Sequence, residues 1–141
     1  MDGVEVKGQK GYGTHIITDK SVDFIKRNKS KPFFLYVAHQ AVHNYYQIPS
    51  DPIGTRGRDV PLHGKGAQAR YKIMLEDLDK GVGKIMDTLK ALDLDQNTLV
   101  IFFSDNGAVR MNPNVRPYRG GKFSNYEGGH RVPAVVSYIS K

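Results

Sequence analysis

An aspartate and an asparagine stand side by side just after an apolar run. Leu99 to Phe103 has the length and composition of a strand, and Asp105 and Asn106 follow it. We predict a strand buried on both faces, as a central strand of a parallel sheet must be. Ligands bind at the carboxyl ends of such strands, and two adjacent oxygen donors suit a hard cation such as Ca²⁺ or Mg²⁺. The same residues also suit an ordinary turn, because Asn-Gly favours positive φ.

A lysine beside two glycines is the next candidate group. Arg119-Gly-Gly-Lys122 places an ammonium group next to residues that let the backbone approach a ligand closely, and Glu127-Gly-Gly-His130-Arg131 repeats the arrangement. With Asp105 and Asn106, these residues would supply a metal site and cations suited to an oxyanion. The alternative for the lysine is that it is simply solvated, as most exposed lysines are.

Two histidines, His39 and His43, follow another apolar run and lie four residues apart. On a helix this spacing would make a metal-binding pair, but a strand before them and Pro49 after them argue against a helix. A histidine just past a strand end can also donate a hydrogen bond to an oxyanion or protonate a leaving oxygen. The alternative for either residue is a partly buried imidazole with a backbone partner.

The composition is that of one folded domain. The chain has 141 residues, of which 39% are hydrophobic and 25% charged, as in ordinary globular proteins. No apolar run approaches the roughly 18 residues of a membrane span, and the first twenty residues lack the apolar segment of a signal peptide. The absence of cysteine excludes disulfides and thiolate zinc sites. The net charge of +7 favours anionic partners, but the scattered lysines and arginines argue against nucleic acid.

Helices and strands alternate along the chain and would position these groups. The predicted elements, in order, are a short helix over 18–28 with Thr18 as N-cap, a strand over 33–38, a surface loop over 48–66, a helix over 67–92, and strands over 99–103 and 132–139. Gly81 and Gly83 weaken the long helix and suggest close packing on a sheet. The order predicts an α/β fold with a mainly parallel sheet flanked by helices.

These segments together resemble the sulfatase family of the alkaline-phosphatase-like superfamily, over about residues 12–141. The matching motifs, in order, are Pro32-Phe-Phe-Leu-Tyr through Gln40-Ala-Val-His43, then Tyr71, Leu78-Asp79 and Val82-Gly83 of the long helix, Asn97 through Gly107, Arg119-Gly-Gly-Lys122, and Glu127-Gly-Gly-His-Arg-Val-Pro133. The combination is far more specific than any one motif.

The resemblance implies an alkaline-phosphatase-like fold and hydrolysis of sulfate esters of sugars or aryl alcohols. Asp105 and Asn106 would be two ligands of a divalent metal, usually calcium in this family. Lys122 would contact the sulfate oxygens, and His43 would bind sulfate near the leaving oxygen. The partner would be a sulfated small molecule or glycan, and family members mostly act in the periplasm, outside the cell or in lysosomes.

The family's nucleophile motif is missing from the chain. Family members oxidise the Cys or Ser of a Cys/Ser-x-Pro-x-Arg signature to formylglycine, whereas Ser50-Asp-Pro-Ile-Gly54 has glycine in place of the arginine and follows His43. We therefore interpret Ser50 as a turn residue. The paired aspartates and the Gly-Lys-x-His segment of the family are missing too.

We therefore expect residues 1–141 to be part of a sulfatase catalytic domain that lacks the N-terminal nucleophile half and the C-terminal subdomain. Alone, it should carry half a metal site and no formylglycine, and it should be inactive and poorly soluble. Two alternatives remain open at this point. One is a phosphoryl-transfer relative in the same superfamily, and the other is a non-catalytic module that binds anionic glycans.

Overall fold

The computed structural model describes residues 9–61, 63–109 and 117–138. The chain divides into two compact units, residues 1–94 and 95–141, and each is described by itself. No helix within the described ranges has the length and apolar character that crossing a membrane requires.

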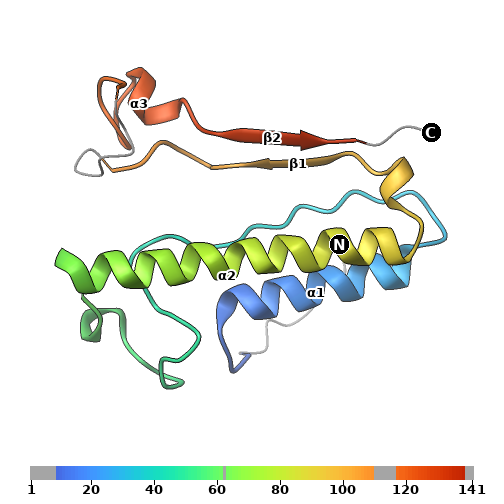
Figure 1. The fold of residues 1–141 in the computed structure, drawn as a ribbon, viewed down its shortest axis with the longest axis horizontal. Coiled ribbons are helices and arrows are strands. Elements are labelled where there is room, and N and C mark those ends of the chain that lie inside the picture. The colour runs from blue at the N-terminus through green and yellow to red at the C-terminus, as the bar shows by residue number, and fades with distance from the viewer. Residues whose placement is uncertain (1–8, 62, 110–116, 139–141) are drawn as a thin grey trace. The chain divides into compact units, whose positions relative to one another are not determined.

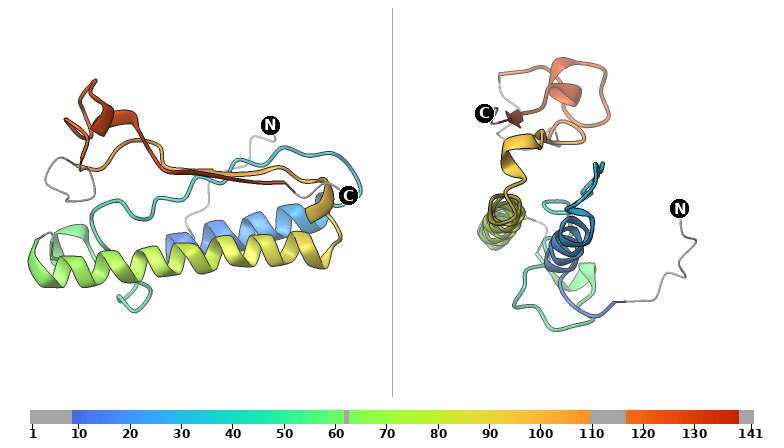
Figure 2. Two further views of the ribbon diagram at one scale, coloured as in Figure 1. Left: turned by 45° about the horizontal axis from the view of Figure 1, so that its top comes forward. Right: turned by 90° about the vertical axis from the view of Figure 1, so that its right-hand side faces the viewer.

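Two long helices run side by side and in the same direction in the first unit (Figures 1 and 2). Helix α1 spans Gly13–Asn28 and helix α2 spans Gly64–Ala91. The polar side-chain contacts between them confirm the direction, because their partners advance together along both helices. His15 contacts Asp77 at 3.0 Å, and Asp19 contacts Lys84 at 2.6 Å. The segment between the helices must therefore return along their whole length before α2 begins.

The face of α1 that meets α2 carries small polar residues as well as apolar ones. Val22 and Ile25 are buried, and so are Thr14, Thr18 and Ser21. The predicted helix start at Thr18 is wrong, because α1 begins at Gly13 and Thr18 is only 3% exposed within it. Apolar periodicity does not indicate the first turn of α1, because the buried residues of that turn are polar.

Helix α2 agrees closely with its predicted range, and within its own unit Gly81 packs closely on another helix. A Cβ added to Gly81 would lie 2.6 Å from Oγ1 of Thr18, so Gly81 allows α1 to approach. A Cβ added to Gly83 would meet nothing within 4 Å. Of the two glycines, only Gly81 is required by packing, and its neighbour is a helix.

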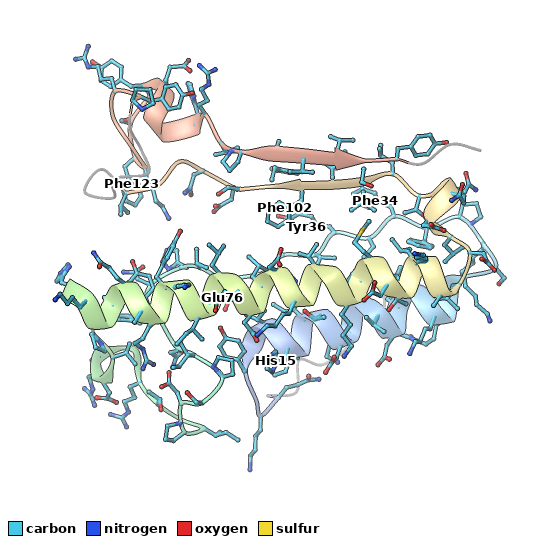
Figure 3. The ribbon with its side chains drawn as sticks, in the orientation of Figure 1. His15, Phe34, Tyr36, Glu76, Phe102 and Phe123 are labelled. Carbon is cyan, nitrogen blue, oxygen red and sulfur yellow. The ribbon has the colours of Figure 1, made fainter. Side chains whose placement is uncertain are left out.

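The predicted strand over 33–38 is extended but is not assigned as a strand. Its residues alternate as those of a strand do: Leu35 and Val37 are half-buried, whereas Phe34 is 88% and Tyr36 75% exposed (Figure 3). The rings of Phe33 and Phe24 of α1 meet edge to face, with centroids 5.8 Å apart. Among the described residues no backbone pairs with this segment, and hydrogen bonding to a neighbour is what defines a strand.

Two short strands form the sheet of the second unit. Strand β1, Val100–Phe103, follows the 3₁₀ turn η2, Asp95–Asn97, and pairs antiparallel with β2, Ala134–Ser137. The third predicted strand, over 132–139, is thus confirmed over 134–137; residues 132, 133 and 138 lie outside β2, and residue 139 lies outside the described residues. The parallel pairing expected for β1 is not formed within the described ranges.

The prediction that the strand over 99–103 is buried on both faces is wrong for this chain. Ile101 is 53% and Phe102 43% exposed, and their partners Val136 and Val135 are each 62% exposed. Burial of a sheet face comes from a second layer packed on it. In the described part of residues 95–141, the helical elements are η2 and α3, Glu127–His130, each too short to form such a layer.

Candidate functional site

Asp105 and Asn106 lie in a bend directly after β1. The hydroxyl of Ser104 donates to the backbone oxygen of Asn106 at 3.0 Å. The side-chain nitrogen of Asn106 donates to the backbone oxygen of Gly107 at 3.0 Å, which leaves its Oδ1 atom as an acceptor. Asp105 is exposed, and its carboxylate forms no ion pair with any residue in the described ranges. Two oxygen donors are therefore available at this strand end.

Backbone hydrogen bonds tie the glycine-rich loop to the same strand end. The amide of Gly107 donates to the oxygen of Gly129 at 2.9 Å, and the amide of Lys122 donates to the oxygen of Ala108 at 2.9 Å. The approach at Gly107 is so close that an added Cβ would lie 1.9 Å from the oxygen of Gly128. The structure thus brings Lys122 next to the segment that carries Asn106.

A tight turn holds Lys122. Gly120 has a φ of 86°, and the hydroxyl of Ser124 accepts a bond from the amide of Gly121 at 3.1 Å and donates to its oxygen at 2.8 Å. The Lys122 ammonium lies 5.4 Å from the centroid of the Phe123 ring. Within the described residues it pairs with no carboxylate, so its charge is available to an anion.

The two arginines of the loop lie on aromatic rings. The guanidinium of Arg119 lies 3.8 Å from the centre of the Tyr126 ring, and that of Arg131 lies 4.7 Å from the centre of the Tyr118 ring. Arg131 also pairs with Glu127 of α3 at 3.2 Å. The two arginines could be recognised as cations from the sequence, but their aromatic partners, Tyr126 and Tyr118, were not predicted. The available signal was the recurrence of aromatic residues in a glycine-rich loop.

His43 belongs to the first unit and lies past the extended segment. Its amide donates to the oxygen of Gln40 at 2.8 Å, and its Nδ1 atom contacts the backbone oxygen of Asn44. With Nδ1–H donating to that oxygen, Nε2 of this exposed ring is the nitrogen left for a ligand. Residues 39–47 form no helix, so His43 and His39 do not make a helical metal pair.

The His39 ring is half-buried. Neither of its nitrogens has a hydrogen-bond partner within the described residues. Burial lowers the pKa of His39 below its ordinary value of 6.5, so the ring is neutral at pH 7. The predicted alternative of a partly buried imidazole is therefore confirmed for the burial but not for the backbone partner.

Helix α2 anchors the loop that follows His43, which runs through the 3₁₀ turn η1, Gly57–Asp59. The Arg70 side chain donates to the oxygen of Tyr46 at 2.7 Å and pairs with Asp51. Burial alone would raise the pKa of Asp51, but hydrogen bonds from Arg70 and from the Ile48 amide, with the charge of Arg70, hold that pKa below its ordinary range. Ser50 lies inside the turn that Asp51 closes, as predicted.

The donor set after β1 suits part of a calcium site. Calcium takes about six to eight oxygen ligands, mainly from carboxylates and carbonyl or amide oxygens, and Asp105 and Asn106 offer two of these types. In the described ranges no group of three His, Cys, Asp or Glu side chains could hold a metal ion. The pair therefore fits a divalent cation only as part of a larger ligand set.

Solved structures define the fold class. The chain is similar to the crystal structure of Ps i-CgsB in complex with k-i-k-neocarrahexaose, with a TM-score of 0.77 and 34% identity over 97% of this chain and 30% of that one. A second crystal structure of Ps i-CgsB gives a TM-score of 0.76 at 35% identity, over 97% of this chain and 30% of that one. The fold is therefore alkaline-phosphatase-like.

The sulfatase family model matches residues 3–141, and the chain belongs to the sulfatase family. It is 40% identical to the N-acetylgalactosamine-6-O-sulfatase of Bacteroides thetaiotaomicron over 139 residues, 89% of this chain and 25% of that protein. It is 37% identical to the steryl-sulfatase of Mus musculus over 138 residues, 90% of this chain and 20% of that protein. The chain thus spans a quarter or less of the length of these relatives.

Proposed function

We propose that the protein containing these residues hydrolyses sulfate esters with the help of a divalent metal. The observation that carries the proposal is the backbone tie between Lys122 and Ala108. It brings the backbone of Lys122, whose ammonium group pairs with no carboxylate of a described residue, to the segment that directly follows the two oxygen donors, Asp105 and Asn106. Membership of the sulfatase family supports the reaction class.

The roles of the residues follow from the charge of the reacting group. A sulfate ester carries negative charge on its free oxygens and gains more on the leaving oxygen in the transition state. In our proposal Lys122 binds the free oxygens. His43, when protonated, donates a hydrogen bond from Nε2 beside the leaving oxygen. Fixed donors aimed at developing charge lower the barrier because they need no reorganisation during the reaction.

Asp105 and Asn106 would hold the metal, for which we propose calcium. A bound cation supplies positive charge against the sulfate oxygens. The formylglycine nucleophile that the family uses would come from residues outside this chain. The contribution of these 141 residues is to hold one side of the metal and to bind the sulfate group.

We propose a sulfated sugar as the substrate. One relative is an N-acetylgalactosamine-6-O-sulfatase, and the similar Ps i-CgsB structure contains k-i-k-neocarrahexaose. The steryl-sulfatase relative shows that membership of the family alone does not select a sugar. The exposed cation and aromatic pairs of the 117–131 loop favour a sugar over a sterol, because a sterol needs an extended apolar surface.

Lys122→Ala in the full product of the gene tests this proposal. We expect its turnover of sulfated monosaccharides to fall about 100- to 1,000-fold, the usual effect of removing one donor to developing charge. The melting temperature should stay unchanged, since the Lys122 side chain forms no ion pair with a described residue. The matched control is Lys90→Ala, an exposed lysine in the last turn of α2, which should keep full turnover.

The same assay separates the alternatives. Turnover that is equal in the wild type and in Lys122→Ala would remove Lys122 from the site. A strong preference for phosphate over sulfate monoesters would indicate a phosphoryl-transfer relative. Binding of sulfated glycans that is salt-sensitive, independent of calcium and without any hydrolysis would indicate a non-catalytic binding module.

A further inference from the structure

Phe123 is the most exposed large apolar side chain of the described residues, at 95%. It lies in the glycine-rich loop, directly after Lys122 (Figure 3). Among the described residues of its unit, the ring covers no buried apolar residue. Packing against the described residues therefore does not explain why an aromatic residue stands at this position.

The backbone at Phe123 is also unfavourable for an aromatic residue. Its φ is 72°, in the left-handed region where bulky residues are rare and glycine, asparagine and aspartate are preferred. The hydrogen bonds between Ser124 and Gly121 hold the turn in this conformation. Strained residues are retained mostly at ligand clamps and active sites. A ring that is both exposed and strained points to a ligand.

The position of the ring beside Lys122 indicates which ligand. The ammonium group lies 5.4 Å from the ring centroid, so an anion held by Lys122 would lie beside the ring. In a sulfated sugar the sulfate group stands a few atoms from a pyranose ring whose C–H groups form an apolar face. Aromatic side chains attract such positively polarised C–H groups with their negative faces.

We propose that Phe123 stacks against the pyranose ring of a sugar whose sulfate group is held by Lys122. This inference rests on the proposed function and deepens it. Lys122 recognises the sulfate, which every substrate shares, and Phe123 recognises the sugar that carries it. Phe123 is thus a specificity-determining residue.

The test compares Phe123→Asn with the wild type in the full gene product. Asparagine tolerates positive φ, so this variant removes the ring without adding strain. We expect the affinity for galactose 6-sulfate, measured by calorimetry, to fall about three- to tenfold, with unchanged affinity for inorganic sulfate, which has no ring. Lys122→Ala should weaken both ligands, and Phe123→Trp should restore the binding of the sugar. KM for galactose 6-sulfate should rise by the same factor with kcat within about twofold.

Each outcome separates this inference from the proposed function. Loss of sugar affinity in Phe123→Asn without hydrolysis by the wild type would support the stacking and overturn the proposed reaction. Hydrolysis with unchanged affinity and KM in the variant would overturn the stacking alone. A lowered melting temperature of Phe123→Asn would show that the ring packs against protein, which also overturns the stacking. A wild type that hydrolyses sulfate esters but does not bind galactose 6-sulfate would overturn the stacking and leave the proposed reaction standing.

Discussion

The carboxylate of Asp105 pairs with no cationic side chain among the described residues. This favours the interpretation of Asp105 as a metal ligand over its interpretation as a turn residue. A carboxylate that only closed a turn would accept a bond from a neighbouring amide, as Asp51 does from Ile48 at 2.8 Å. Asp105 makes no such bond within the described ranges, although it stands beside Asn106 at a strand end. This arrangement is what a metal ligand needs before the metal arrives.

Asp105→Ala should therefore bind calcium more weakly while keeping its fold. We expect calcium to raise the melting temperature of the wild-type gene product, because a ligand that binds the native state stabilises it. The variant should bind calcium at least about tenfold more weakly, because affinity depends on the number of charged ligands. Asp87→Ala, an exposed aspartate of α2, serves as the control and should respond like the wild type. An equal response to calcium in Asp105→Ala would exclude this residue as a ligand.

The candidate residues could be predicted from the sequence, but their contacts and backbone conformations could not. Asp105 and Asn106 could be predicted because an apolar run ends beside them, and Lys122 because of its glycine neighbours. The tie between Lys122 and Ala108 could not be predicted, since it depends on glycines that permit contact between two backbones. The left-handed φ of Phe123 could not be predicted either, because phenylalanine rarely adopts this conformation.

At the scale of elements, α1 and α2 depend on one glycine for their close contact. Gly81 faces Thr18, whereas Gly83, two residues later, faces open space. The two glycines share a helix and a residue type and differ in their surroundings, so they form a matched pair.

We expect Gly81→Ala and Gly83→Ala to change stability in opposite directions. Alanine gains about 0.5–1 kcal/mol over glycine inside a helix, and Gly83→Ala should show this gain. Gly81→Ala should lose about 1 kcal/mol net, because overpacking costs about 1–3 kcal/mol and the helical gain offsets part of it. Urea denaturation followed by circular dichroism measures both. A stabilised Gly81→Ala would show that α1 and α2 separate easily.

The elements that could be predicted are those whose own residues carry the pattern. Helix α2 repeats apolar residues over its whole length, and its range was predicted to within three residues at each end. The first turns of α1 were missed because Thr14 and Thr18 are polar and buried. The extended segment over 33–38 has the alternation of a strand, but a strand also needs a partner, which its own residues do not contain.

At the scale of the whole molecule, the two-stranded sheet exposes apolar side chains on both faces. Phe102 and its partner Val135 lie on one face, and Ile101 and its partner Val136 on the other. Isolated two-stranded sheets are marginally stable in water, and exposed apolar edges promote association. The poor solubility expected from the sequence stays a prediction, and the structure supplies the residues with which to test it.

The 141-residue chain by itself should self-associate through this sheet. Sedimentation velocity should show species larger than a monomer, with a proportion that grows with concentration. Replacing Phe102 and Val135 by threonine places a β-branched residue, which suits a strand, at both positions and removes apolar area, so the variant should shift toward the monomer. A wild-type chain that stays monodisperse and melts cooperatively would contradict this prediction.

The parallel direction of α1 and α2 has a consequence for how the chain reaches its structure. A helical hairpin forms contacts between neighbours in the sequence, whereas the side-chain hydrogen bonds between these helices join residues 62 and 65 positions apart. The segment that connects the two helices must run back along α1, antiparallel to it, before α2 can pack against α1. Contacts of this separation slow folding, because the entropy of closing the loop is lost before the contact is gained. During synthesis, α1 leaves the ribosome many residues before the helix that covers its buried threonines exists.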